Sequence, residues 1–580
     1  MIISNVIDGV VLASAPLTTK RAHGIVTKSL LSAAAGITIS LCFSNTANAQ
    51  DASQSSQCDP YKNYSCLDNY LGSGIFDRFA NYYKLEWGES APPADPNAPS
   101  AERDGWPATP ESTPPMAYSE FPTGALTSIG VSRPNGADSP LMVAIANTEF
   151  GKWLTDNNTQ IYGWINPGFN FSTNNNKFGN APVAYTVNPD TAELDQAVLY
   201  VERVPDTVQT DHVDWGFRLS AIYGQNYRYT NSYGLASWQF NGQNGWEGYD
   251  FPMAYVDVWI PQVFEGLEVR VGRFISIPDI EAQLAPNNIM YTHSLTYAVD
   301  NYTNTGVVLS WQLSKNLLLQ TGVVDGTETP IWHNGLKIPN SYVQSGSNAA
   351  GFGPGIDPLF PNATMLKDPG NQPSLTLCLR YESDDGNTVF YPCLNGINKG
   401  NWGYNNLQWH GFTFYHRFDA QWHVDFETYW MSENDVPNLN NPQAVALFNN
   451  GGTPFSPQNL NFNSPNLAYC GKLAVLDCTV NAFGIVSYIN YSPDRLDNIS
   501  LRPEFYDDPN GWRTGTGKPT KYADLTLSWQ HWLSPQIEFR PEISWWHSYR
   551  VAAFNGDVYA GISGNKSDMT EFASDVIIHF

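Results

Sequence analysis

Histidine and aspartate side chains stand close together at two places in this chain of 580 residues, and such groups can activate a serine for nucleophilic attack. The first group is Asp211, His212 and Asp214, and the second is His410, His416, His423 and Asp425. Both groups flank short turns between expected strands, where histidines usually have structural roles. Patterns such as Gly-x-Ser-x-Gly, His-Glu-x-x-His or a phosphate-binding glycine loop do not occur in a supporting context. The sequence therefore favours a protein that is not an enzyme and has no cofactor or metal, with a barrel-wall hydrolase as a weaker alternative.

Cysteine spacing indicates disulfide chemistry. Six of the seven cysteines form three pairs of near neighbours: Cys58 with Cys66, Cys378 with Cys393, and Cys470 with Cys478. Cys378 and Cys393 are equidistant from Asp385-Gly386, a dipeptide that favours a tight hairpin turn, so they would face each other across two strands. Free thiols that are merely close in sequence are the alternative. Metal binding is disfavoured because there is no Cys-x-x-Cys pair.

The N-terminus has the features of a secretory leader, which would place the cysteines in an oxidising compartment. Basic residues at 20, 21 and 28 precede the small and apolar run 29–43, and Ala47-Asn48-Ala49 offers small residues at a cleavage site. We expect residues 1–49 to be a signal peptide. No later stretch approaches the roughly 18 apolar residues that a spanning helix needs, so any membrane insertion must use strands.

The composition indicates an all-β protein. Only 15% of the residues are charged, 14% are aromatic, and the chain contains 46 glycines and 40 prolines. This is too aromatic for a disordered chain and unlike a helical enzyme. The net charge of −25 disfavours a nucleic-acid partner, because phosphate recognition requires a basic surface.

Residues 50–155 differ from the rest of the chain. The stretch 90–115 is rich in proline and is expected to be an extended linker. Before it, Ile75, Phe79 and Tyr82 have helical spacing, and after it Ser139-Pro140 can begin a short helix that runs to about Leu154. These helices either pack against a larger body or form a periplasmic plug.

From residue 156 to residue 580 apolar and polar residues alternate in segments of about ten residues, the length of a strand that crosses a bilayer at a tilt. We count about 14 such segments, within a range of 12–16. The connections between them alternate between short and long, as in a barrel with short periplasmic turns and long extracellular loops. The predicted fold is a transmembrane antiparallel up-and-down β-barrel with short N-terminal helices.

The end of the chain alternates in the same way. Phe572, Val576, Ile578 and Phe580 share one face of the last expected strand. A terminal aromatic residue on such a strand is similar to the signal that the barrel assembly machinery reads. We therefore expect these four residues to form an assembly signal.

Several longer strings resemble the OmpL-like outer-membrane β-barrel porins, over about residues 161–580. These strings are Tyr162-Gly163-Trp164, the run 201–218 from Val-Glu-Arg-Val-Pro to Trp-Gly-Phe-Arg, the run 271–281 beginning Val-Gly-Arg-Phe, Pro286-Asn287-Asn288, and the two triplets Arg502-Pro503-Glu504 and Arg540-Pro541-Glu542. The resemblance implies a pore in the outer membrane of a Gram-negative bacterium, in contact with outer-membrane lipid and lipopolysaccharide, and a homotrimer by analogy. It implies no catalytic residues, and it leaves Cys470 and Cys478 unexplained.

Period-two alternation assigns twelve charged residues to the interior of the barrel. They are Arg218, Asp257, Glu268, Arg270, Asp425, Glu427, Arg502, Glu504, Asp524, Glu538, Arg540 and Glu542. Acidic residues outnumber basic ones in this set, so we expect a passive channel for small hydrophilic solutes and ions with a mild preference for cations. The alternative is that these charges pair with one another and brace the wall.

The connections allow two further readings. The stretch 272–293 contains Asp279, Glu281, Asn287 and Asn288 and is long enough to fold inward as a constriction. Aromatic and amide residues at 227–243 and 395–405 suit contact with sugars, so a saccharide-selective channel is an alternative. A closed barrel that acts as a binding or structural protein is a further one.

Overall fold

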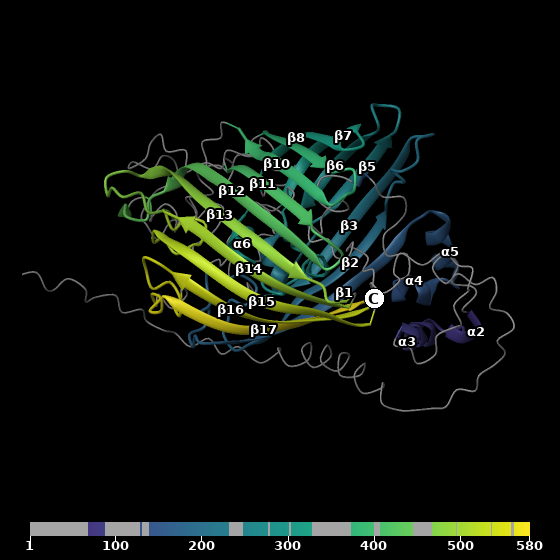
Figure 1. The fold of residues 1–580 in the computed structure, drawn as a ribbon, viewed down its shortest axis with the longest axis horizontal. Helices are drawn as coiled ribbons and strands as arrows, with labels where there is room; N and C mark the ends of the chain where they lie inside the picture. The colour runs from purple at the N-terminus through teal and green to yellow at the C-terminus, as the bar shows by residue number, and fades with distance from the viewer. Residues whose placement is uncertain are drawn as a thin grey trace, which may run out of the picture. The chain divides into compact units, whose positions relative to one another are not determined.

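A computed structural model describes residues 68–86, 128–129, 139–230, 247–275, 279–300, 303–327, 373–398, 407–442, 444, 467–494, 496–534, 536–557 and 562–580. The expected signal peptide, the proline-rich linker and the Cys58 and Cys66 pair lie outside these residues. Antiparallel strands form a closed barrel (Figure 1). Its wall strands are β1 (Gln160–Ser172), β2 (Ala192–Arg203), β3 (Asp214–Gly224), β5 (Ala254–Ile260), β6 (Leu267–Ile275), β7 (Thr303–Ser314), β8 (Leu317–Thr327), β9 (Ser374–Glu382), β10 (Thr388–Ile397), β11 (Gln408–Arg417), β12 (Trp422–Pro437), β13 (Asp477–Tyr491), β14 (Asp497–Asp508), β15 (Thr520–Ser534), β16 (Ile537–Ser548) and β17 (Asp568–His579).

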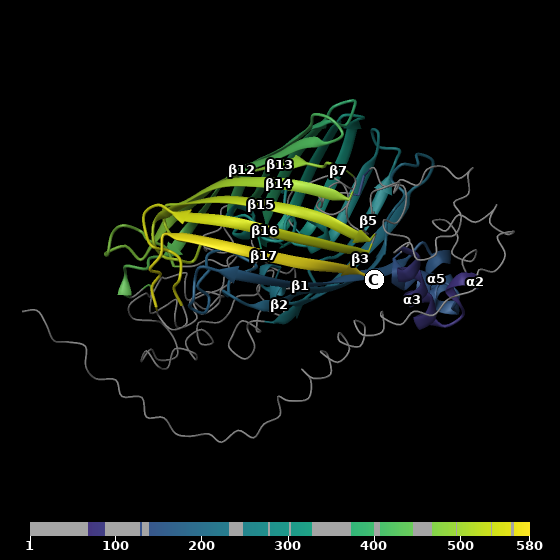
Figure 2. The same cartoon turned by 60° about the horizontal axis from the view of Figure 1, so that its bottom comes forward.

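The first and last strands close the barrel. β1 pairs with β2 on one side and with β17 on the other (Figure 2), and Trp164 lies opposite His579. Beyond the last strand residue, the backbone of Phe580 exchanges two hydrogen bonds with Gly163, at 3.0 and 2.8 Å. The short strand β4 (Gly248–Asp250) pairs with the end of β3 and is the only strand of the 17-stranded sheet outside the wall, which leaves 16 wall strands. This is the upper end of the predicted range.

The two strands missing from the predicted count of about 14 are β9 and β10. The sequence predicts this hairpin from its turn, but the predicted count of wall strands does not include it. It is inserted between β8 and β11, with Cys378 directly opposite Cys393 and bonded to it. The predicted pairing of Cys378 with Cys393 across a hairpin is therefore confirmed, and both cysteines lie in wall strands.

The connections alternate as predicted. Short ones lie at 204–213, 261–266, 315–316, 383–387, 418–421, 492–496 and 535–536, and long ones lie at 173–191, 225–253, 276–302, 328–373, 438–476, 509–519 and 549–567. The connection 398–407 belongs to the long set by position but is only as long as 204–213. Because β9 and β10 add one connection of each kind, the extra hairpin preserves the alternation, and both ends of the barrel chain lie on the side of the short turns.

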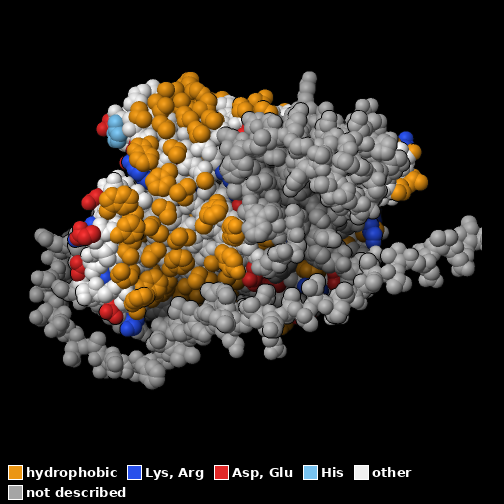
Figure 3. Space-filling model, turned by 180° about the vertical axis from the view of Figure 1, so that it is seen from behind, with side chains coloured by type: hydrophobic (Ala, Val, Ile, Leu, Met, Phe, Trp, Pro, Cys, Tyr) orange, Lys and Arg blue, Asp and Glu red, His pale blue; other side chains and the backbone are white. Residues whose placement is uncertain are grey.

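Polarity alternates across the wall. On β15 the side chains of Leu525 and Leu527 are 46% and 49% exposed, whereas those of Asp524 and Thr526 are buried. Figure 3 shows hydrophobic side chains over much of the outer surface, with charged side chains gathered along one margin. Exposed aromatic residues occur near both ends of this apolar surface: Trp215, Phe390 and Trp422 near short turns, and Phe171, Tyr223 and Phe483 near long connections. This distribution is typical of a barrel that spans a bilayer.

Short helices precede the barrel. They are α2 (Asp68–Leu71), α3 (Ile75–Glu86), α4 (Pro140–Ile145) and α5 (Glu149–Asp156). The Ser139 side chain caps α4 as expected by accepting a hydrogen bond from Met142 N, but the predicted single helix is divided in two, because Thr148 caps a new helix. The buried Arg78 side chain joins α3 to α4 through a hydrogen bond to the Val143 carbonyl oxygen. Within the described residues, no helix has the length and hydropathy needed to cross a membrane.

Candidate functional site: the barrel interior

All twelve charged residues that the alternation assigned to the interior are buried, none being more than 6% exposed. Each is flanked along its strand by residues that face outward. The residue set predicted from the sequence therefore occupies the inner face of the wall. What these residues contact decides whether they are available to a solute.

The four arginines of this set form ion pairs with neighbouring wall strands. Arg270 bonds both carboxylate oxygens of Asp257 at 2.8 Å. Arg502 donates to Asp524 at 2.8 Å, and Arg218 donates to Glu202 at 2.6 Å. Arg540 pairs with Asp575. The alternative in which these charges brace the wall is thus the arrangement found for the basic residues.

Two of the acidic partners, Glu202 and Asp575, were missed by the sequence analysis. Both are fully buried. Asp575 lies on the face of its strand opposite to that of Phe572 and Val576. The alternation could therefore have assigned it to the interior. The last strand was read only as an assembly signal, and that role for its outward residues stays a prediction.

The connection between β6 and β7 folds into the interior. We call residues 279–300 the inward loop; it includes the helix α6 (Leu295–Ala298), which lies beside β13 and β14 (Figure 1). Residues 272–275 of the predicted constriction belong instead to β6. From Asp279 onward the chain contacts strands on several sides of the barrel. The stretch predicted to fold inward therefore lies inside the barrel, with its boundary shifted by several residues, and its role as a constriction stays a prediction.

Wall carboxylates bind backbone N–H groups of the inward loop. Glu427 accepts from Ile280 N at 2.9 Å, Glu504 accepts from Leu295 N at 2.9 Å, and Glu542 accepts from Tyr291 N at 3.1 Å. These charge-assisted hydrogen bonds are stronger than neutral ones, so three strands hold the loop in place.

Wall arginines complete the attachment by binding loop carbonyl oxygens. Arg540 Nη1 donates to the carbonyl oxygens of Ala285 and Asn288 at 2.8 and 2.6 Å, and Arg502 donates to that of Thr292. Each of these two arginines thus binds a wall carboxylate and the inward loop at the same time. Buried carbonyls and N–H groups of the loop obtain partners that irregular backbone cannot provide for itself.

Other segments also enter the interior. Glu571 accepts hydrogen bonds from Thr186 Oγ1 and Asn180 Nδ2, at 2.9 and 3.1 Å, in the connection after β1. Glu268 accepts from Ser128 N at 2.7 Å, so a residue from before the barrel reaches the inner wall. The charged interior therefore holds several segments in addition to the inward loop.

His293 lies in the inward loop in an aromatic stack. Its ring lies 3.8 Å from the ring of Tyr185 and 5.1 Å from that of Tyr297, and Nε2 lies 2.8 Å from the carbonyl oxygen of Ala282. Burial lowers the pKa of His293 to about 3, because the imidazolium would be desolvated. The ring is therefore neutral at ordinary pH.

Because His293 is buried and neutral, we expect the folded protein to lose stability in acid. Between about pH 6.5 and about pH 3 the unfolded chain binds a proton at residue 293 that the folded chain does not, so the free energy of unfolding decreases as the pH falls. The contribution is about 1.4 kcal/mol per pH unit. Urea unfolding of the wild type and of His293→Gln in lipid vesicles, from about pH 7 to about pH 4, should show a weaker pH dependence for the variant. Parallel curves would contradict this account.

The candidate catalytic groups do not form a triad. In the first group, His212 Nδ1 lies 3.0 Å from Asp211, whose pKa is lowered by that hydrogen bond, but Asp214 pairs with Arg203 instead. In the second group, His416 contacts Thr388 and His423 lies 3.9 Å from Asp425. None of the hydrogen bonds that the described residues make to these histidines comes from a serine side chain.

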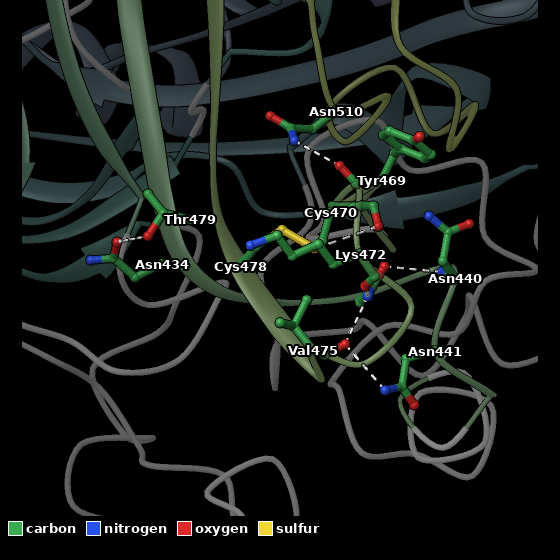
Figure 4. Close-up of a disulfide and its surroundings, with 12 residues drawn as sticks. Asn434, Asn440, Asn441, Tyr469, Cys470, Lys472, Val475, Cys478, Thr479 and Asn510 are labelled. Carbon is green, nitrogen blue, oxygen red and sulfur yellow. Dashed lines mark hydrogen bonds between the residues drawn. A yellow bond between two sulfur atoms is a disulfide. The ribbon is translucent and has the colours of Figure 1, made fainter.

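The second disulfide lies at the start of β13. Cys470 and Cys478 are bonded, with Cα atoms 5.8 Å apart. Figure 4 shows the surrounding asparagines; Asn441 Nδ2 donates to the Val475 carbonyl oxygen at 3.1 Å, and Asn510 Nδ2 donates to that of Tyr469 at 2.8 Å. The pairing predicted from the spacing of these cysteines is therefore confirmed, and it ties the connection 438–476 to β13.

Comparison with known proteins supplies a family. A family model described as putative beta-barrel porin-2, OmpL-like, matches residues 158–580. Similar solved structures include the anion-selective porin from Comamonas acidovorans (9% identity, 73% of this chain and 99% of that chain, TM-score 0.42) and the outer-membrane channel DcaP of Acinetobacter baumannii (9%, 73% and 97%, TM-score 0.40). OmpT of Vibrio cholerae is similar at 8% identity over 73% of this chain and 99% of that chain, with a TM-score of 0.38. No curated protein matches.

Proposed function

Because the chain belongs to the putative β-barrel porin-2, OmpL-like family, we propose that it is a passive outer-membrane channel for small hydrophilic solutes and ions. The observation that carries this proposal is the reversal of polarity across a closed wall. Apolar side chains face outward and charged side chains face inward, which suits a barrel with lipid outside and water-soluble species inside. The Gram-negative outer membrane is the setting that the family implies.

We further propose a mild preference for cations. Every arginine among the twelve predicted interior residues already has a carboxylate partner, so its charge is neutralised locally. Acidic residues such as Asp425 and Glu504 have no arginine within ion-pair distance in the described residues, so this set of twelve has more acidic than basic groups. Charges of one sign in a narrow passage favour ions of the opposite sign.

Planar-bilayer recordings test both parts of the proposal. The refolded mature protein should show stable conductance steps, and a salt gradient should give a reversal potential that favours cations. Asp425→Asn should weaken this preference, because Asp425 faces inward and, among the described residues, is hydrogen-bonded by neutral Asn490 and lies 3.9 Å from His423. Asp385→Asn is the matched control, because it removes the same charge from an exposed turn. A reversal potential that favours anions would refute the selectivity.

A closed barrel is the second candidate, and a specific observation favours it. The interior carboxylates are occupied by the inward loop, by the connection after β1 and by Ser128. If a protein shown to be folded and heat-modifiable gives no conductance, the binding or structural function would replace the channel. Block of conductance by one added oligosaccharide would instead favour a saccharide-selective channel, whose expected aromatic segments lie largely outside the described residues.

The expected partners remain proposals. We propose contact with outer-membrane lipid and lipopolysaccharide through the apolar outer surface, assembly through the terminal strand by the barrel assembly machinery, and a homotrimer as in many porins. Chemical cross-linking of the protein in native membranes would give the number of subunits.

A further inference from the structure

Three buried carboxylates converge at one point of the barrel interior. Asp279, Asp300 and Glu427 each place an oxygen within 4.8 Å of the oxygens of the other two. Their exposed fractions are 6%, 1% and 0%. Asp279 and Asp300 are the first and last residues of the inward loop, and Glu427 lies on β12. The cluster therefore joins both ends of the loop to the wall.

The side chain of Glu427 points to a missing ligand. Its Oε2 atom accepts the hydrogen bond from Ile280 N, but its fully buried Oε1 atom has no hydrogen-bond donor among the described residues. The charged groups that act on it most strongly are Asp300, Glu281 and Glu504, which are all acidic. A buried carboxylate oxygen without a donor or a cation is costly, so this atom requires a partner.

Arg513, which binds the end of the inward loop, does not supply that partner. Arg513 Nε donates to the backbone carbonyl oxygen of Val299 at 2.6 Å, and its Nη2 atom donates to that of Asp300. Neither Arg513 nor any other described arginine or lysine forms an ion pair with Glu427. The Arg513 guanidinium group therefore binds the backbone at the end of the inward loop. The Glu427 carboxylate is left without a bound cation among the described residues.

The donor set selects a class of ion. All three side chains offer carboxylate oxygens, which bind hard cations, and the cluster includes no sulfur or imidazole ligand of the kind that zinc prefers. The three oxygens lie within 4.8 Å of one another, so a single Ca²⁺ ion, with Ca–O distances of about 2.4 Å, can contact all three. Ca²⁺ also tolerates irregular geometry, whereas Mg²⁺ demands a smaller and near-octahedral arrangement.

We propose that Asp279, Asp300 and Glu427 bind a Ca²⁺ ion that fastens both ends of the inward loop to β12. The ion neutralises the three charges and supplies the partner of Glu427 Oε1. This site does not depend on whether the barrel conducts, because its ligands and its effect on stability are independent of transport.

Calorimetric titration with Ca²⁺ tests the site directly. The full mature protein, refolded and freed of metal with a chelator, is expected to bind one ion per chain and to unfold at a higher temperature when Ca²⁺ is present. Glu427→Gln and Asp300→Asn preserve side-chain shape and should each weaken binding by about tenfold or more, since each removes one of three anionic ligands. If one variant fails to fold, the other carries the test.

Glu571→Gln is the matched control, because it neutralises a buried interior carboxylate that binds Thr186 and Asn180 instead of the cluster. It should bind Ca²⁺ like the wild type. The proposal is overturned if the wild type binds no Ca²⁺, if both cluster variants bind as tightly as the wild type, or if Mg²⁺ binds more tightly than Ca²⁺. In the first case the carboxylates would share protons instead of a metal ion.

Discussion

Replacing residues 279–300 with a short glycine and serine linker is expected to raise the single-channel conductance several-fold. The inward loop lies across the interior and is bound by β12, β14 and β16 through Glu427, Glu504 and Glu542. Its removal opens the space that it occupies and exposes these carboxylates to water, so the preference for cations should also become stronger. Conductance steps and reversal potentials in planar bilayers measure both effects.

The control for this change is the same linker placed in the turn at 383–387, where Asp384 and Asp385 are exposed and which lies outside the interior. That variant should conduct like the wild type. Heat-modifiable migration in gels shows for each variant whether the barrel has folded. A folded variant without the inward loop whose conductance equals that of the wild type would contradict the constriction.

Arg540→Ala is expected to lower the free energy of unfolding by about 3–5 kcal/mol, the range for breaking one partner of a buried ion pair. Arg540 is fully buried and bonds Asp575 as well as the carbonyl oxygens of Ala285 and Asn288. Its loss leaves the buried Asp575 charge without its cation and removes the arginine donor from two loop carbonyl oxygens, of which that of Ala285 keeps a hydrogen bond from Asn288 N. Urea unfolding of the protein in vesicles gives this quantity.

Two companion variants separate the causes. Lys521→Ala breaks the ion pair with Asp507, in which the two side chains are 33% and 26% exposed. It should lower the free energy of unfolding by no more than about 1 kcal/mol. Adding Asp575→Asn to Arg540→Ala should recover part of the loss, because the unpaired buried charge is then absent. A cost for Arg540→Ala as small as that for Lys521→Ala would show that the interior is much more hydrated than this structure implies.

The wall could be predicted because its signals are local. Alternation of side chains identified most strands, and the turn at Asp385-Gly386 identified the hairpin of β9 and β10. Its outward residues Leu375, Leu377 and Leu379 even alternate as in the other strands. Whether that hairpin joins the wall depends on its pairing with β8 and β11, and β8 lies beyond the connection 328–373. Such long-range pairing leaves no local pattern to read.

The contents of the interior could be predicted only in part. The alternation of inward and outward side chains predicted Arg502 and Arg540 to lie inside the barrel. Asp524 lies on the next strand, so its pairing with Arg502 could also be predicted. The attachment of the inward loop joins residues about 150–250 positions apart, as between Tyr291 and Glu542. Asp300 lies beyond the predicted constriction, so the carboxylate cluster did not emerge from the sequence.

The pairing of β1 with β17 has a consequence for the order of assembly. All other neighbouring wall strands follow one another in the chain, so their hairpins can form as they are delivered, whereas Trp164 meets His579 only when the last strand is present. This step joins residues about 400 positions apart and has the largest loop-closure entropy of the wall pairings. Until it occurs, the curved sheet has two unsatisfied edges that can pair with other chains. A protein factor that shields or templates those edges would therefore act at this junction more than anywhere else in the wall.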